Sequence, residues 1–493
     1  MSDQPNILII HADQHRCDAL GAYGNADIST PNIDALAADG VRHDRHFCSF
    51  PVCTPSRYSF LSGLHVHQHL GWNNHCTLPA GLPTFPRALR ESGYCTTAVG
   101  KMHFTPTYLD VGFEEMRLAE QDGPGRFDDD YHRYLQAEGL CDRLDLVDQR
   151  REYRDLASDA YWRNLGAMVS DLDEEHHSTT WIADRAMEAL ADWGEGGHLL
   201  MAGFIKPHHP FDPPAPWHEM YDPEALTLMP GWTQNCLPRD LACSAGYFPN
   251  ADMTEAQLRR AMAYYYATIS QIDHHVGRMI DLLKQKGLYD NTLVVYTSDH
   301  GDYLGFHHLL LKGNHMYDPV MRIPLIVKYP GQRGAGQSTT ALSSNIDMAP
   351  TLMARAGCDV PETMAGRDLE ERPGGREAVF AEAGRREYMV RTGNRKLLLN
   401  RETDDSLFFD LERDPHELEN LYGDPACRDE IAELRERLLE WSLFTCPSPV
   451  HLDERGPMSS PANAAGFDSE TRREQERYFA EQMERPSELT SQG

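Results

Sequence analysis

The chain has 493 residues, 41% of them hydrophobic, which is typical of a globular protein with two or three packed units. It carries 46 basic and 76 acidic residues, a formal net charge of −30. Such an acidic surface repels phosphate groups, which excludes nucleic-acid and anionic-membrane binding as expected functions. An anionic substrate would need a local positive pocket.

The cysteines and the N-terminus favour a cytoplasmic protein. The eleven cysteines are an odd number without a paired framework, as is typical of a reducing compartment. Residues 1–10 lack the basic leader, apolar stretch and cleavage site of a secretory signal. No apolar run approaches the roughly 20 residues of a membrane helix. We therefore expect a cytoplasmic protein.

Strand and helix patterns alternate over the first three quarters of the chain. Helices are expected over 31–38, after Thr30 as N-cap, and over 254–286, before Gly287. This alternation predicts an α/β fold with a large, mostly parallel sheet and helices on both faces. The predicted strands are residues 7–10, 95–99, 199–205, 292–296 and 324–327.

From about residue 375 the pattern changes to short apolar runs separated by turn residues. These runs predict a small antiparallel sheet, followed by a helix over 429–443. Beyond Cys446, one further helix is expected over 470–484, in a tail that is loose or docked on a partner subunit. The predicted organisation is a catalytic domain over 1–374, an α+β subdomain over 375–445 and an extension over 446–493. The predicted strands of the small sheet are 378–382, 388–391, 396–399 and 406–410.

Polar residues follow four of the predicted strands directly or within two residues. They read HADQ at 11–14, GKMH at 100–103, KPHH at 206–209 and DHGD at 299–302. In an open parallel sheet, ligands bind outside the carboxyl ends of the strands. The sequence therefore predicts one shared site that collects carboxylates, imidazoles and lysines from four strands.

The stretch FPVCTPSRYSFLSG at 50–63 places a thiol at an expected helix start. Cys53 would lie at the positive end of the helix dipole, which favours anions and lowers the pKa of a thiol. Arg57, four residues on, can share a face with Cys53 and grip two oxygens of a tetrahedral oxyanion. For an isolated pair of this kind, a buried cysteine beside a surface ion pair is the preferred interpretation.

Further motifs change that interpretation. Residues 52–57 (VCTPSR) and 60–63 (FLSG), together with 93–103 (GYCTTAVGKMH), resemble the signatures of the type I sulfatases, in the alkaline-phosphatase-like superfamily. Asp13 and residues 299–301 fit the same pattern, and the resemblance runs in order from about residue 5 to about residue 420. Ser62 departs slightly, since the family more often has threonine or alanine there.

The resemblance implies that a formylglycine-generating enzyme oxidises Cys53 to formylglycine. The aldehyde hydrates to a geminal diol. One hydroxyl, deprotonated on a metal, attacks sulfur and displaces the alcohol, and the second collapses to the aldehyde and expels sulfate. A serine or a thiol has no such internal exit.

The resemblance also implies a divalent metal. Its ligands would be Asp13, Asp299, His300 and the residue made from Cys53, with Gln14 as an amide ligand where many relatives have a second aspartate. Oxygen ligands favour Ca²⁺, and Mn²⁺ or Mg²⁺ also fit.

The remaining expected site residues bind sulfate or transfer protons. By resemblance, Lys101 bridges the sulfate and formylglycine oxygens, and His103 helps to break down the sulfated intermediate; two residues apart in an extended segment, they can project in the same direction. The resemblance further implies that His208 protonates the leaving oxygen and that Lys312 shares this task and binds sulfate. His209 is the less favoured alternative and is expected to face solvent.

By resemblance, Asn74 is a candidate for contact with the sulfate or the leaving group, because an asparagine at about this place makes that contact in some relatives, choline sulfatases among them. A turn residue is the alternative interpretation.

Three functions remain open. The first is hydrolysis of a sulfate monoester of a small molecule or a sugar. The second is a phosphonate monoester or phosphodiester hydrolase, because some of those relatives have a single aspartate at the first strand, as here with Gln14. The third is a non-catalytic binding protein on the same fold. A homo-oligomer is a further expectation, because the charged tail beyond Cys446 suggests subunit contacts.

Overall fold

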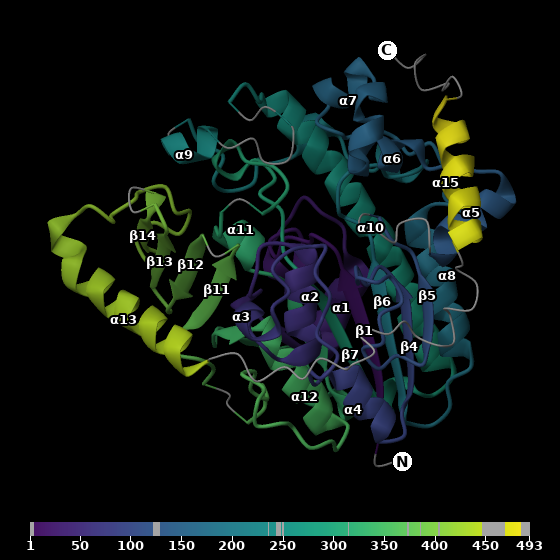
Figure 1. Ribbon diagram of the computed structural model, residues 1–493, viewed down its shortest axis with the longest axis horizontal. Coiled ribbons are helices and arrows are strands. Elements are labelled where there is room, and N and C mark those ends of the chain that lie inside the picture. The colour runs from purple at the N-terminus through teal and green to yellow at the C-terminus, as the bar shows by residue number, and fades with distance from the viewer. Residues whose placement is uncertain are drawn as a thin grey trace.

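The computed structural model describes residues 4–121, 129–234, 236–242, 248, 251–313, 315–371, 374–384, 386–402, 405–445 and 469–484. Within these ranges a large sheet and a small sheet lie side by side (Figure 1). The expected α/β fold with a separate antiparallel C-terminal sheet is confirmed.

The large sheet has eight strands in the order β5-β4-β6-β1-β7-β8-β2-β9. The first five in this order run parallel to one another. β8 pairs antiparallel with both β7 and β2, so the run predicted over 324–327 is a strand but does not extend the parallel part. The bounds are β1 Asn6–Ala12, β2 Val41–His43, β4 Cys95–Gly100, β5 Glu115–Leu118, β6 His198–Phe204, β7 Thr292–Ser298, β8 Leu325–Lys328 and β9 Gln337–Thr339.

Both faces of the central strand β1 are buried. Ile7 and Ile9 belong to one hydrophobic core and Leu8 and Ile10 to another, because alternate side chains of a strand point to opposite faces. This two-sided burial explains why β1 is a continuous apolar run. Helices α1 Pro31–Asp39, α8 Ser178–Ala191 and α10 Glu255–Gln285 contribute to one core, and α2 Cys53–Ser62, α4 Phe85–Glu91 and α12 Met348–Arg355 to the other.

The small sheet contains β11 Val379–Ala383, β12 Glu387–Arg391, β13 Arg395–Asn400 and β14 Leu407–Asp410, each antiparallel to the next. Helix α13 Arg428–Phe444 packs on one face of this sheet through Leu434, Leu438 and Trp441. The other face packs against the large domain, where Leu398 and Phe409 join a core with Phe306 and Met316.

Helix α15 Ser469–Glu484 returns to the large domain and lies along α5 Asp130–Glu138 (Figure 1). Phe479 is fully buried there, and the hydroxyl of Tyr478 donates to the carbonyl of Leu140 at 2.8 Å. The expectation of a loose or partner-docked tail is therefore wrong for 469–484, because an apolar face of α15 is buried within its own chain. Residues 446–468 and 485–493 lie outside the described residues.

Shorter elements complete the described parts of the chain. Among the described residues, no helix is both long and apolar enough to span a bilayer. The shorter elements include β3 His46–Phe47, β10 Ser343–Ser344, α3 Val66–His69, α6 Arg143–Gln149, α7 Asp159–Arg163, α9 Pro238–Leu241 and α11 Asp318–Met321.

Candidate active site

The four polar clusters that follow β1, β4, β6 and β7 meet at the carboxyl edge of the parallel strands. The Nζ of Lys101, after β4, lies 2.9 Å from Oδ2 of Asp13, after β1. Asp299 follows β7, and its Oδ1 accepts from the backbone N–H of Gln14 at 3.0 Å. The chain order of these residues is scattered, but the parallel strands bring them to one place.

Cys53 is the first residue of α2, whose N-terminus faces this edge. The hydroxyl of Ser56 donates to the carbonyl of Asp299 at 2.6 Å, which ties the first turn to the end of β7. Gly63 ends the helix in the left-handed conformation that glycine adopts at little cost, with φ of 66°. The helix therefore delivers the Cys53 side chain into the site.

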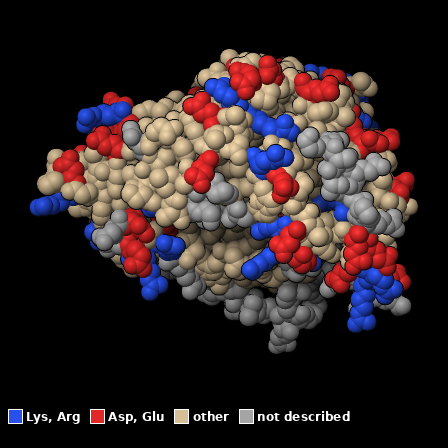
Figure 2. All heavy atoms as spheres, turned by 90° about the horizontal axis from the view of Figure 1, so that it is seen from above, with Lys and Arg blue, Asp and Glu red and all other residues tan. Residues whose placement is uncertain are grey.

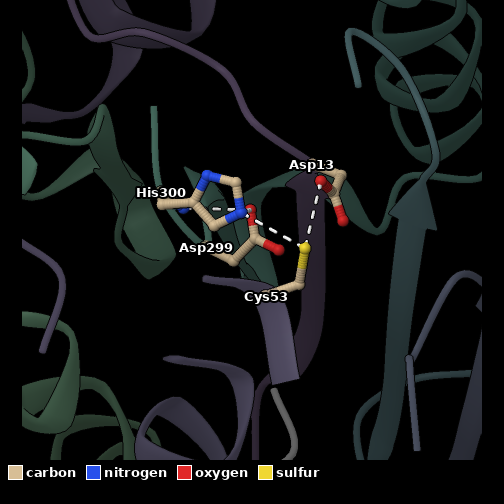
Figure 3. A group of neighbouring side chains, drawn as sticks. All are labelled: Asp13, Cys53, Asp299 and His300. Carbon is tan, nitrogen blue, oxygen red and sulfur yellow. Dashed lines mark hydrogen bonds and ion pairs between the residues drawn. The ribbon is translucent and has the colours of Figure 1, made fainter. Parts of the chain in front are cut away.

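Asp13, Cys53, Asp299 and His300 form one fully buried group (Figure 3). One ligand atom from each lies within 4.8 Å of the others. The Nδ1 of His300 contacts the carbonyl of Gly301 at 2.9 Å, which leaves Nε2 facing the sulfur of Cys53 at 3.2 Å. Two carboxylates and an imidazole with a fixed orientation fit a divalent cation.

Gln14 lies beside this group with its amide engaged on both sides. Its Nε2 donates to Oδ2 of Asp302, and its Oε1 accepts from Nζ of Lys312 at 2.7 Å. The expected amide ligand is thus adjacent to the donor group, with its oxygen directed toward Lys312.

Arg57 supports the carboxylates. Its Nε donates to Asp299 and one terminal nitrogen donates to Asp13, each at 2.9 Å, while the other donates to the carbonyl of Lys101 at 2.7 Å. The side chain is 1% exposed. Three N–H groups of Arg57 are therefore used within the protein, which differs from the expected grip on a substrate oxyanion.

The pKa of the Cys53 thiol is raised to about 12. Burial is the main cause, and the carboxylate of Asp13 adds to it. The expectation that the helix dipole lowers this pKa is therefore wrong, because burial and a neighbouring negative charge outweigh the dipole. In the structure the unmodified side chain is a protonated thiol at neutral pH.

Asp13 stays ionised at neutral pH. Burial by itself favours the neutral acid, but the positive charge of Lys101, followed by that of Lys312, holds the pKa of this carboxyl well below its usual range. Lys101 stays protonated in turn, since Asp13 raises its pKa against the effect of burial.

His103 offers a neutral imidazole to the site. Burial, followed by the charge of Lys101, lowers the pKa of His103 well below its usual value. Neither ring nitrogen has a hydrogen-bond partner among the described residues. The backbone of His103 has a φ of 58°, so Lys101 and His103 do not share the extended segment that the sequence suggested.

His208 and Lys312 also lie close to Asp13. The Nδ1 of His208 contacts the carbonyl of His209 at 2.6 Å, so Nε2 points away from that carbonyl. Burial lowers the pKa of His208 well below its usual value, and Lys312 and Lys101 act in the same direction. The Nζ of Lys312 is 4.0 Å from Oδ1 of Asp13, and its side chain is 15% exposed.

His209 does not face solvent, as the sequence had suggested. It is 1% exposed, and its Nδ1 lies 2.6 Å from Oδ1 of Asp148 while its Nε2 contacts the carbonyl of Leu165 at 3.1 Å. Both ring nitrogens are held within the protein, so His209 is not available to the site.

Asn74 contacts the start of α2, because its Oδ1 accepts from the backbone N–H of Thr54 at 3.1 Å. Its amide oxygen is therefore occupied in capping the helix, and only its NH₂ group remains for a ligand.

Sequence reasoning missed Glu120 and Gln121, which follow β5. Glu120 accepts from the backbone N–H groups of Met102 and His103, and Gln121 accepts from Nζ of Lys101 at 3.3 Å. These two residues follow a fifth strand, just as the predicted site residues follow the other four. The run EMRL of β5 is too short and too polar to be identified as a strand from the sequence.

Charged side chains of both signs are interspersed over the face shown in Figure 2. That face carries no large field of one sign. Inside the site, Lys101 and Lys312 place positive charge beside Asp13.

The chain belongs to the sulfatase family. The family model described as sulfatase matches residues 5–358, and a second model, described as N-sulphoglucosamine sulphohydrolase, C-terminal, matches residues 306–443. A large parallel sheet with a buried donor group at its carboxyl edge agrees with this membership.

Named relatives agree with the family. A choline-sulfatase of Rhizobium meliloti is 32% identical, over 73% of this chain and 69% of its own. An arylsulfatase of Clostridium perfringens is 28% identical, over 89% of this chain and 94% of its own. The structure of a phosphonate monoester hydrolase of Agrobacterium radiobacter has the same fold, with a TM-score of 0.75, 24% identity and coverage of 92% of this chain and 99% of that one.

Proposed function

We propose that the protein hydrolyses a sulfate monoester with a formylglycine made from Cys53. The observation that supports this most directly is the buried group of Asp13, Cys53, Asp299 and His300, placed at the sheet edge of a sulfatase-family chain. Its four donors lie after β1, at the start of α2 and after β7. A structural ion pair alone would not require a cysteine at its centre.

Two added groups complete the proposed site. A formylglycine hydrate at position 53 would supply one hydroxyl that attacks sulfur and a second that later expels sulfate, and a divalent cation, Ca²⁺ by preference over Mn²⁺ or Mg²⁺, would supply positive charge beside them. Asp13, Asp299 and His300 would hold the cation. Gln14, whose amide oxygen accepts from Lys312, would offer the second lone pair of that oxygen to the cation.

The protein's own cations orient the ester. Arg57 fixes the two carboxylates, and Lys101 places a positive charge beside Asp13. Binding of an anionic sulfate group next to His208 would stabilise its protonated ring, which then gives a proton to the departing oxygen. Lys312 stabilises the negative charge that develops there, and the unpartnered ring of His103 accepts a proton from residue 53 when sulfate is expelled.

The substrate is a sulfate ester of a small molecule or a sugar, and maturation requires a formylglycine-generating enzyme in the host. The cysteine pattern supports a cytoplasmic location. Among the described cysteines, none is paired in a disulfide.

The test begins with intact-mass measurement of protein purified from its native host. Conversion of Cys53 exchanges SH₂ for O and lowers the mass by about 18 Da. Turnover of an aryl sulfate should accompany this change, and metal analysis of the active protein should find one divalent cation per chain. An unconverted and inactive protein from the native host would instead support a binding protein on this fold.

A phosphonate monoester or phosphodiester hydrolase is the second candidate. It is favoured by Gln14, which occupies the place of a second carboxylate and lowers the negative charge beside the substrate. Paired rates on an aryl sulfate, a phosphate diester and a phosphonate monoester with the same leaving group separate the two. The sulfatase proposal is wrong if kcat/KM for either phosphorus ester is higher by orders of magnitude.

A further inference from the structure

Asp302 is a fully buried carboxylate behind the donor group, without a role in the chemistry described so far. Its Oδ1 accepts from the backbone N–H of Leu304 at 2.7 Å and from that of Leu311 at 3.1 Å. Its Oδ2 accepts from Nε2 of Gln14. One side chain thus holds both a loop and an amide that reaches the site.

The contact with Asp302 determines which way the Gln14 amide lies. An ionised carboxylate only accepts hydrogen bonds, so it selects the NH₂ end of the amide. The oxygen of Gln14 must then point away from Asp302, and it accepts from Nζ of Lys312 at 2.7 Å. If the amide were reversed, two acceptors would face each other on one side and two donors on the other.

The same carboxylate also places the backbone that carries Lys312. Leu311, the preceding residue, adopts a φ of 62°, which is unfavourable for a branched side chain and needs support from its surroundings. Asp302 supplies it by accepting from the N–H of Leu311, while the carbonyl of Leu311 accepts from the N–H of Tyr303 at 2.9 Å.

We propose that Asp302 is a positioning residue that sets the direction of the Gln14 amide and thereby the location of the Lys312 ammonium group. Among the described residues, the amide oxygen of Gln14 is the one hydrogen-bond partner of Lys312. The part played by Lys312 at the departing oxygen rests on the proposed function. The orientation of the amide by Asp302 does not.

The single variant Asp302→Asn reverses the polarity of one contact at nearly constant shape. The new amide keeps its oxygen on the two backbone N–H groups and turns its NH₂ group toward Gln14. Gln14 must then rotate and present its own NH₂ group to Lys312, which repels the ammonium. For a sulfate ester with a poor leaving group, kcat should fall by about 10- to 100-fold. For an ester with a good leaving group, which needs little help, it should fall by less than about threefold.

The double variant Asp302→Asn with Gln14→Glu restores the polarity. The carboxylate introduced at position 14 accepts from the new NH₂ group and offers its second oxygen to Lys312, and the total charge is that of the wild type. The double variant should recover kcat for the poor leaving group to within about threefold of wild type, because the two changes compensate each other. Gln14→Glu alone places two carboxylates together and should be impaired.

Asp273→Asn is the matched control. Asp273 is also buried and accepts from two backbone N–H groups, of Asn32 and Ile33, and from the side-chain amide of Asn32. It contacts none of the site residues in the structure. This variant should lower stability without changing the dependence of kcat on the leaving group.

Crystal structures of the wild type, Asp302→Asn and the double variant supply a readout that does not need turnover. The Nζ of Lys312 should lie within hydrogen-bond distance of residue 14 in the first and third, and not in the second. The inference is overturned if Lys312 keeps this contact in Asp302→Asn, if the loss of kcat is equal for all leaving groups, or if the double variant is not rescued. A wild type that converts Cys53 and yet hydrolyses no sulfate ester refutes the proposed function, and the crystal structures still decide the orientation.

Discussion

Two clusters of buried charge in this molecule have similar pairs at their centres. In the active site, Lys101 has a fully buried side chain and lies 2.9 Å from Asp13. Between the large domain and the small sheet, Lys396 is equally buried and lies 2.8 Å from Asp318. We call the second group the seam cluster; it consists of Asp318, Arg391, Lys396 and Glu417.

The clusters differ in what surrounds the pairs. In the seam cluster the charges face one another: Lys396 also lies 2.6 Å from Glu417, and Glu417 accepts from the backbone N–H of Asp318 at 2.7 Å. In the active site, neither ring nitrogen of His103 has a hydrogen-bond partner among the described residues, and Lys312 is partly open to solvent. Buried charge alone therefore does not mark a catalytic site. What sets the active site apart from the seam cluster is a buried imidazole ring without a hydrogen-bond partner beside a lysine that is partly open to solvent.

The largest expected effect is that of Cys53→Ala, which removes the proposed nucleophile. Turnover should fall by at least about 10⁴-fold, because the remaining groups only bind and orient the ester. The free energy of unfolding should change by only about 1 kcal/mol, since a single sulfur is removed. Steady-state kinetics and chemical denaturation measure the two quantities.

Cys48→Ala is the matched control for this prediction. Cys48 is also a buried thiol, at 1% exposure, but its sulfur contacts the carbonyl of Val320. The control variant should keep the turnover of the wild type. Equal activity of both variants would exclude Cys53 as the nucleophile.

His208→Ala tests the active-site cluster at the leaving group. We expect kcat to fall by about 10²- to 10⁴-fold, with the greatest loss for poor leaving groups, because those need a proton most. His209→Ala should instead lower stability, since it removes the buried contact between Nδ1 of His209 and Oδ1 of Asp148 at 2.6 Å. A series of aryl sulfates with graded leaving groups separates the two outcomes, and a loss that does not depend on the leaving group would contradict the role of His208.

The sequence predicted the strands that lead into the site because their apolar runs are buried on both faces. β1, β4, β6 and β7 were each located within two residues at either end. The antiparallel direction of β8 was not predicted, because strand direction depends on pairing and not on composition. The short edge strand β5 was missed, and Glu120 and Gln121 with it.

Residue identities in the site were predictable, but their protonation and partners were not. The sequence placed Cys53 at a helix start and suggested a lowered thiol pKa, whereas burial raises it. It placed Arg57 near Cys53, yet the partners of Arg57 are carboxylates from two distant strand ends. Depth and long-range contacts determine both properties, and neither is encoded by local spacing.

Lys396→Met sharpens the contrast between the clusters through stability. Loss of Lys396 leaves the fully buried carboxylate of Glu417 without its cation, while the partly exposed Asp318 keeps Arg391, and it should cost about 3–5 kcal/mol of the free energy of unfolding. Turnover per folded molecule should remain. Lys101→Met should do the reverse, because Asp13 keeps Arg57 at 2.9 Å while the ester loses a positive charge. Urea denaturation and kinetics on both variants test this contrast. It is wrong if Lys396→Met and Lys101→Met lose equal amounts of stability.

The smallest expected effect concerns Glu120, which supports the backbone of His103. Burial is the main reason that the pKa of this carboxyl is raised to about 7 from its ordinary value of 4.5. Between these two values the folded state binds more protons at Glu120 than the unfolded state, so this group makes stability fall as pH rises, by up to about 1.4 kcal/mol per pH unit. Above pH 7 the full free-energy cost of ionising the buried carboxyl of Glu120 is present.

Glu120→Gln replaces the titrating carboxyl group with a neutral amide. It keeps an oxygen that accepts from the backbone N–H groups of Met102 and His103. The variant should match the wild type in stability near pH 4.5 and exceed it above pH 7, with a difference of no more than about 3.4 kcal/mol. Denaturation curves of both proteins at a series of pH values measure the difference directly and cancel the contributions of other groups. A difference that stays constant across this range would show that Glu120 is already ionised at pH 5, and that its contacts with the backbone outweigh its burial.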